Sequence, residues 1–226
     1  MKNLRKIITT SAIALTLGMS VAQISTTTVS AAKTEKSSKS STLEGGWQVN
    51  KGSFSLNKNK TAKAAFDKAI DGLTGYSYEP IAYLGSQVVA GMNYSYLCKG
   101  SVVVPNAKTE YFILNVYQDL NGKAEITGTT NLLKVGTKKN SWKFNQTSTS
   151  LNKNAKAKAA FNKVNKKKFQ PIAYIGKQIK NGTNYAIFCR NAKTKSYNLV
   201  VVNQKGKKAK VAQVKNVSLA VEANKN

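Results

Sequence analysis

The spacing of apolar residues after residue 60 predicts one amphipathic helix. Apolar side chains recur there every three or four positions, which places them on one face of a helix. The members of this stripe are Ala62, Ala65, Phe66, Ala69, Ile70 and Leu73. Asn59 is a suitable N-cap, and Gly72 or Gly75 can end the helix. Because the alanines are small, this helix can lie close to a curved sheet.

Beyond this helix the pattern changes to four segments rich in β-branched and aromatic residues. Segments of this composition are typical of strands, and turn residues such as Asn121-Gly122 separate them. The predicted strands are residues 78–86, 92–99, 111–118 and 124–128. A parallel arrangement needs further helices between the strands, and the pattern contains none. We therefore predict an α+β fold, in which one helix packs on an antiparallel four-stranded sheet.

The same pattern occurs twice along the chain. The matched segments are 55–59 with 150–154, 80–83 with 171–174, and 106–109 with 191–194. Their separation falls from 95 to 91 and then to 85 residues, so the second copy carries two short deletions. This duplication predicts two tandem domains, residues 43–137 (repeat 1) and residues 138–226 (repeat 2).

Residues 1–32 have the pattern of a secretory signal peptide. Lys2, Arg5 and Lys6 precede an uncharged stretch with an apolar centre, which ends in the small residues 29–32. The alternative is a membrane anchor, but a spanning helix needs about 20 apolar residues and the second half of this stretch is rich in Ser and Thr. Residues 33–42 read as a flexible leader. We expect a secreted, extracellular protein.

The composition argues against catalysis. The 226 residues include no histidine and only nine carboxylates. This excludes hydrolases with an imidazole base and metal sites with histidine ligands, so we expect no enzyme, no cofactor and no metal. Cys98 and Cys189 occupy equivalent positions in the two repeats. They are either buried free thiols or a disulfide between the repeats; a reactive nucleophile is disfavoured because no imidazole can activate it.

The segment between the first two predicted strands is apolar where a hairpin tip is ordinarily polar. Residues 87–91 read Gln-Val-Val-Ala-Gly, and Asn93-Tyr94 follows. This resembles the Gln-x-Val-x-Gly signature of the cystatins, inhibitors of papain-like cysteine proteases. The pair Gly45-Gly46, which precedes the predicted helix, is similar to the glycine trunk of that family.

The resemblance implies two tandem cystatin-like domains, the first of which blocks a papain-like protease reversibly without a cofactor. The implied protease-binding residues are Gly45, Gly46, Gln87, Val88, Val89, Ala90, Gly91 and Leu120. Leu120 stands in the second hairpin, where the extracellular cystatins carry a Pro-Trp pair, so the Trp anchor is missing. Repeat 2 has Lys180 in the corresponding loop, and we expect it to be inert toward such proteases. The alternative is a plain hairpin without a target.

The net charge of +27 is concentrated in repeat 2. Repeat 1 has nine basic and seven acidic residues, whereas repeat 2 has 21 basic residues and one acid. The lysines expected to bind a polyanion are Lys166, Lys167, Lys168, Lys177, Lys180, Lys205, Lys207, Lys208 and Lys210.

This contrast predicts that repeat 2 is attracted to a polyanion, such as an anionic cell-wall polymer, a membrane surface or extracellular nucleic acid. A solvated face that keeps the protein soluble is the alternative. Specific nucleic-acid recognition is not expected, because no such motif is present. The sequence thus favours a secreted protease inhibitor held near an anionic surface. The alternative function is an envelope-associated binding or adhesion module that inhibits nothing.

Overall fold

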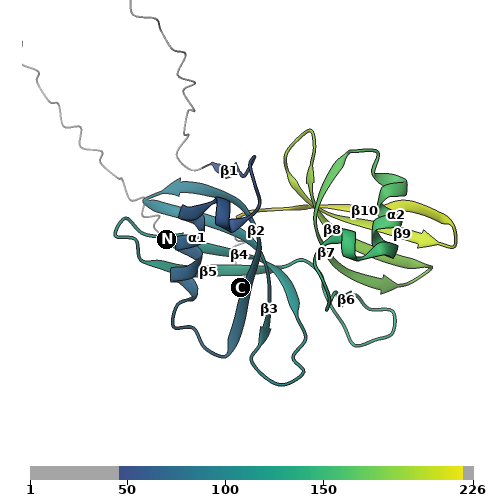
Figure 1. Cartoon of the computed structure of the whole chain (residues 1–226), viewed down its shortest axis with the longest axis horizontal. Coiled ribbons are helices and arrows are strands. Elements are labelled where there is room, and N and C mark those ends of the chain that lie inside the picture. Colours follow the sequence, from purple (N-terminus) through teal and green to yellow (C-terminus); the bar gives the residue numbers. More distant parts are fainter. Residues whose placement is uncertain (1–45, 221–226) are drawn as a thin grey trace, which may run out of the picture. The chain divides into compact units, whose positions relative to one another are not determined.

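The computed structural model describes residues 46–220, whose helices and strands are shown in Figure 1. The predicted signal peptide and leader lie outside the described residues, as does Gly45. Within the described part of the chain, no helix is long and apolar enough to cross a membrane.

Repeat 1 folds into one α-helix and an antiparallel sheet. Its elements are β1 (Trp47–Val49), the 3-10 turn η1 (Leu56–Lys58), α1 (Lys60–Ile70), β2 (Tyr76–Val89), β3 (Gly91–Val102), β4 (Glu110–Gln118) and β5 (Ala124–Asn131). The five strands lie in the order β1-β2-β3-β4-β5, so every strand pairs with its neighbour in the sequence. The prediction of one helix followed by antiparallel strands is confirmed.

The predicted number of four strands is wrong, because each sheet has five. The additional strand in repeat 1 is β1, an edge strand in which Trp47 lies opposite Gln87 of β2. Its three residues are too few for an alternating pattern to emerge from the sequence. The four predicted strands are present at the expected places, and each is longer than predicted.

Helix α1 packs its predicted apolar stripe against one face of the sheet. The side chains of Ala62, Ala65, Phe66 and Ala69 are buried, together with residues of β3 and β4. The helix ends at Ile70, so the prediction that its stripe extends to Leu73 is wrong. Residue 73 lies beyond the helix and is 49% exposed.

The start of α1 is organised differently from the prediction. Asn59 occupies the N-cap position, but its side chain makes no capping hydrogen bond. Instead its amide nitrogen donates to the backbone carbonyls of Ser53 and Ser55, at 2.7 Å each. Asn154 makes the equivalent pair of bonds in repeat 2. This asparagine therefore holds the turn that leads into the helix.

Repeat 2 reproduces the architecture of repeat 1. Its elements are β6 (Lys143–Phe144), η2 (Leu151–Lys153), α2 (Ala155–Asn165), β7 (Phe169–Ile179), β8 (Thr183–Asn191), β9 (Tyr197–Lys205) and β10 (Lys208–Val217). The register of β2 on β3 shifts between Pro80 and Ala82, and that of β7 on β8 shifts at the equivalent Pro171 and Ala173. The duplication thus extends to the irregularities of the sheets.

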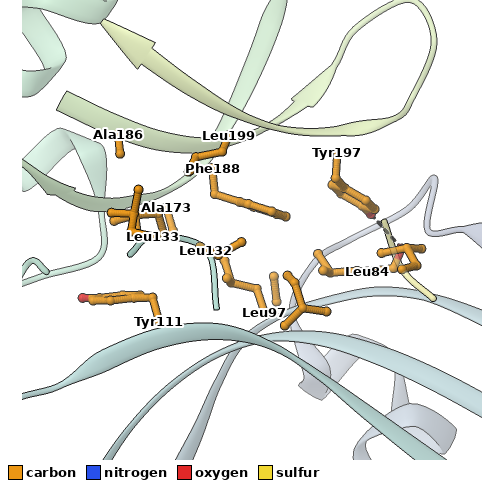
Figure 2. Packing of buried hydrophobic residues seen from close by; sticks show 14 residues of the cluster. Leu84, Leu97, Tyr111, Leu132, Leu133, Ala173, Ala186, Phe188, Tyr197 and Leu199 are labelled. Atoms are coloured by element: carbon orange, nitrogen blue, oxygen red, sulfur yellow. Dashed lines mark hydrogen bonds between the residues drawn. The ribbon is translucent and has the colours of Figure 1, made fainter. Parts of the chain in front are cut away.

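The sheet faces that look away from the helices contribute to one shared apolar cluster. Leu84 and Leu97 of repeat 1 are buried in it together with Phe188 and Leu199 of repeat 2 (Figure 2). The central strands are therefore apolar on both faces. The described residues all belong to one compact unit.

Hydrogen bonds between the repeats are reciprocal. The Tyr111 hydroxyl donates to the carbonyl of Asn145 at 2.9 Å, and the equivalent Tyr197 donates to the carbonyl of Leu84 at 2.8 Å. Burial raises the pKa of Tyr111 to about 12, so its hydroxyl remains protonated at neutral pH. Near the C-terminus, the Asn115 side chain donates to the buried carbonyl of Leu219 at 2.5 Å. Side chains of each repeat thus donate hydrogen bonds to backbone carbonyls of the other repeat.

Both cysteines are buried free thiols, which rules out a disulfide between them. Cys98 packs in the cluster beneath α1, and Cys189 packs in the separate cluster beneath α2. Burial raises the pKa of each thiol, so the reactive thiolate is scarce at neutral pH.

We expect neither Cys98 nor Cys189 to react with a thiol reagent in the native protein at neutral pH, because both are inaccessible and protonated. Both should react once denaturant unfolds the chain. Colorimetric thiol titration with and without denaturant measures the difference. Fast modification of either thiol in the native protein would contradict their burial.

Candidate functional site

The β2–β3 hairpin is paired almost to its tip. Val89 pairs with Gly91, which leaves Ala90 as the turning residue. The Val89 side chain is 40% exposed and Ala90 is also exposed. The backbone of Gly91 has a φ of +126°, in the region that favours glycine. The predicted apolar loop is therefore a short, exposed hairpin end.

Neighbouring strand β4 supports this tip closely. A Cβ atom on Gly91 would lie 2.4 Å from the Gln118 carbonyl oxygen, so only glycine fits there without a shift. The Tyr117 hydroxyl donates a hydrogen bond to the carbonyl of Ala90. On the other side, Asn93 Nδ2 donates to Gln87 Oε1 at 2.9 Å. The tip is thus held by side chains as well as by strand pairing.

Strand register brings the predicted protease-binding residues from Gly46 onward to one end of the sheet. Trp47 lies opposite Gln87, Gln87 opposite Asn93, and Asn93 opposite Tyr117. Gly46 directly precedes β1, and Leu120 lies just beyond β4 in the β4–β5 turn. We call the set Gly46, Val88, Val89, Ala90, Gly91 and Leu120 the hairpin edge.

The hairpin edge contains no charged residue and exposes apolar side chains. Leu120 is 85% exposed at the tip of the second hairpin. That turn is fixed, because the backbone nitrogen of Gly122 donates to the carbonyl of Asp119 at 3.1 Å. Lys68 of α1 donates to the Gly122 carbonyl at 2.9 Å. Both hairpins therefore present their tips from a supported backbone.

The corresponding hairpin of repeat 2 differs in shape and charge. Ile179 pairs with Thr183, so the tip consists of three residues rather than one. Lys180 stands where repeat 1 has Val89, and its backbone nitrogen donates to the Gly182 carbonyl at 3.0 Å. Repeat 2 thus carries a charge at the tip that is apolar in repeat 1.

The lysines predicted to bind a polyanion lie at two different ends of the repeat 2 sheet. One group consists of Lys166, Lys167 and Lys168, which directly precede the first residue of β7. The others are near the β7–β8 tip or the β9–β10 turn, which are adjacent because Thr183 lies opposite Gln204. This second group consists of Lys177, Lys180, Lys205, Lys207, Lys208 and Lys210. The nine lysines therefore do not form one patch.

Tyr117 is the site residue that sequence analysis missed. It lies one residue before the end of β4, in a run that reads simply as strand. Its position beside the tip depends on the register between β3 and β4, which the apolar pattern alone does not fix.

Within residues 46–220, no three His, Cys, Asp or Glu side chains gather where they could hold a metal ion. The order of helix and antiparallel sheet in both repeats is consistent with cystatin-like folds. Compared with models of known protein families and with curated protein sequences, the chain gives no match.

Proposed function

We propose that this protein is a secreted, reversible inhibitor of a papain-like cysteine protease and that the hairpin edge of repeat 1 fills the protease cleft. The observation that carries the proposal is the strand register. It places Gly46, the tip at Ala90 and Leu120 at one end of the sheet. Three separate segments can therefore contact one groove together.

The shape of the tip suits an inhibitor rather than a substrate. A papain-like protease cleaves a peptide whose carbonyl reaches the catalytic cysteine at a suitable angle. Here the Ala90 carbonyl accepts a bond from Tyr117, and the flanking residues are fixed by strand pairing. A rigid tip also loses little conformational entropy on docking, which favours tight binding.

The absence of charge on this tip makes burial in an apolar cleft favourable. Val88 and Val89 offer apolar surface, and Leu120 adds more from the second hairpin. A lysine at the same place, as in repeat 2, must lose its hydration without gaining a partner. We therefore assign the inhibition to repeat 1.

The test is the change Val89→Lys, which gives repeat 1 the residue that repeat 2 has at its tip. We expect it to raise the inhibition constant for papain about 100-fold, because the lysine must lose part of its hydration when the tip enters the apolar cleft. Val89 is partly exposed, so the fold should be unaffected. Inhibition assays with the full chain measure the effect.

The matched control is Val103→Lys, because this valine is 68% exposed in the β3–β4 loop, far along β3 from the tip. It should leave the inhibition constant unchanged. If the two changes raise the inhibition constant equally, the hairpin edge is not the surface that binds papain. If the unaltered protein in large molar excess leaves papain active, the alternative function as an envelope-associated binding module is favoured.

A further inference from the structure

Three neighbouring cavities, which share lining residues, lie beside the first turn of α2. The largest, about 770 Å³, lies between the start of β4, the segment between the repeats, β6 and Tyr174. The second, about 360 Å³, shares Asn154, Tyr174 and Lys177 with it. The third, about 460 Å³, shares Lys156 and Tyr185 with the second and reaches the β9–β10 turn. We call this surface the α2 groove.

The α2 groove is strongly cationic. Four lysines line it, namely Lys108, Lys143, Lys156 and Lys177, whereas Glu110 is its only acid. In the described chain none of these lysines makes an ion pair. Their charges are therefore free to attract an anionic ligand.

Repeat 1 lacks three of these charges at the equivalent positions. Lys143 lies opposite Lys177 on β6 and β7, whereas the equivalent pair in repeat 1 is Gln48 opposite Ser86. Lys156, in the first turn of α2, corresponds to Thr61 in α1. Three lysines of repeat 2 thus stand at groove positions where the other copy is neutral.

The remaining lining of the groove is apolar or uncharged. Phe144, Tyr174 and Tyr185 supply aromatic surface, and the first turn of α2 carries no acidic residue. The first and third cavities share no lining residue and are linked by the second, so the groove extends through all three. This shape suits an extended chain better than a compact small molecule.

We propose that the α2 groove binds an extended chain of phosphate groups. Lysine binds phosphate as a point charge, and a phosphate chain carries negative charge at a higher density than an acidic peptide, so a group of lysines attracts it more strongly. The only arginine in the described residues, Arg190, is used elsewhere: it donates to the Asn50 carbonyl at 2.8 Å and lies over the Phe54 ring. Three lysines of repeat 2, with Lys108 of repeat 1, therefore form the proposed binding site, which does not depend on protease inhibition.

The test compares two triple variants of the full chain, with short inorganic polyphosphate as the probe. The groove variant, Lys143→Gln with Lys156→Thr and Lys177→Ser, installs the residues that repeat 1 tolerates at these positions. The control, Lys166→Asn with Lys167→Asn and Lys195→Asn, removes equal charge at positive-φ positions that asparagine accepts. Titration at several salt concentrations gives the affinity and its salt dependence.

We expect the groove variant to bind polyphosphate about 100-fold more weakly and the control to lose far less. The slope of log affinity against log salt should fall in magnitude by about 2 in the groove variant, since three phosphate contacts are lost. Equal losses in both variants would show that the charge acts diffusely, and would overturn the proposal. Failure of the unaltered protein to bind polyphosphate would also overturn it.

Poly-L-glutamate of equal length serves as the competing ligand class. We expect the unaltered protein to bind it more weakly than polyphosphate. Tighter binding of polyglutamate would identify an acidic peptide as the partner instead and reject the phosphate chain. Thermal unfolding of both triple variants verifies that the differences do not come from loss of the fold.

Discussion

Repeat 1 produced alone, as residues 43–137, should not persist as a stable folded monomer. In the whole chain, the sheet face opposite α1 is buried in the shared cluster, where Leu84, Leu97 and Ile113 are almost completely inaccessible. Without repeat 2 this contiguous apolar face meets water, which soluble monomers rarely tolerate. Analytical ultracentrifugation should find self-association, and thermal unfolding should occur at a much lower temperature than in the whole chain.

Mixing this fragment with residues 138–226 provides the control. The two fragments should form a one-to-one complex, because repeat 2 contributes Phe188, Leu199 and Leu219 to the same cluster. Its Tyr197 also supplies the hydrogen bond to the Leu84 carbonyl. A fragment 43–137 that is monomeric and as stable as the whole chain would contradict the importance of the shared cluster.

The sequence allowed the repeats, the helices and the order of the main strands to be predicted, because periodicity reports these features directly. The stripe from Ala62 to Ala69 is buried as its spacing requires. Turn residues separate the strands at the expected places. The duplication added a second, independent copy of the same pattern, which made one helix and one sheet per repeat a consistent prediction.

The shared cluster was not predicted, although the sequence contains a signal for it. Residues 111–116 of β4 are an almost unbroken apolar run, and all six are buried. A strand with one solvated face alternates between apolar and polar residues, whereas a run of this kind indicates that both faces are covered. Phe112 and Leu114 face α1, while Tyr111 and Ile113 join the shared cluster.

Covering both faces of each sheet restricts where a partner can bind. The helices occupy one face and the shared cluster occupies the other, so hairpin ends and edge strands remain accessible. The hairpin edge of repeat 1 lies at such an end. The α2 groove runs along the equivalent region of repeat 2, from β6 to the β9–β10 turn. After duplication, the same region of the fold thus has apolar tips in one copy and lysines in the other.

The change Phe188→Ala should destabilise both repeats together. Phe188 is fully buried in the shared cluster and stacks on Tyr197, with ring centroids 5.6 Å apart. Its side chain lies among residues from both repeats (Figure 2). Removing the ring leaves a cavity, which should lower the free energy of unfolding by about 3–5 kcal/mol. Denaturant titration measures this loss, and Val103→Ala in an exposed loop should change it by less than about 0.5 kcal/mol.

Amide hydrogen exchange can show whether the loss reaches repeat 1. Phe188 belongs to β8 in repeat 2, whereas β4 belongs to repeat 1. If the shared cluster makes the two repeats unfold as one unit, the most protected amides of β4 and β9 should lose the same free energy of protection. Unchanged protection in β4 alongside faster exchange in β9 would mean that each repeat is stable by itself. Equal acceleration in both strands is the expected result, because Leu97, Ile113 and Phe188 share one core.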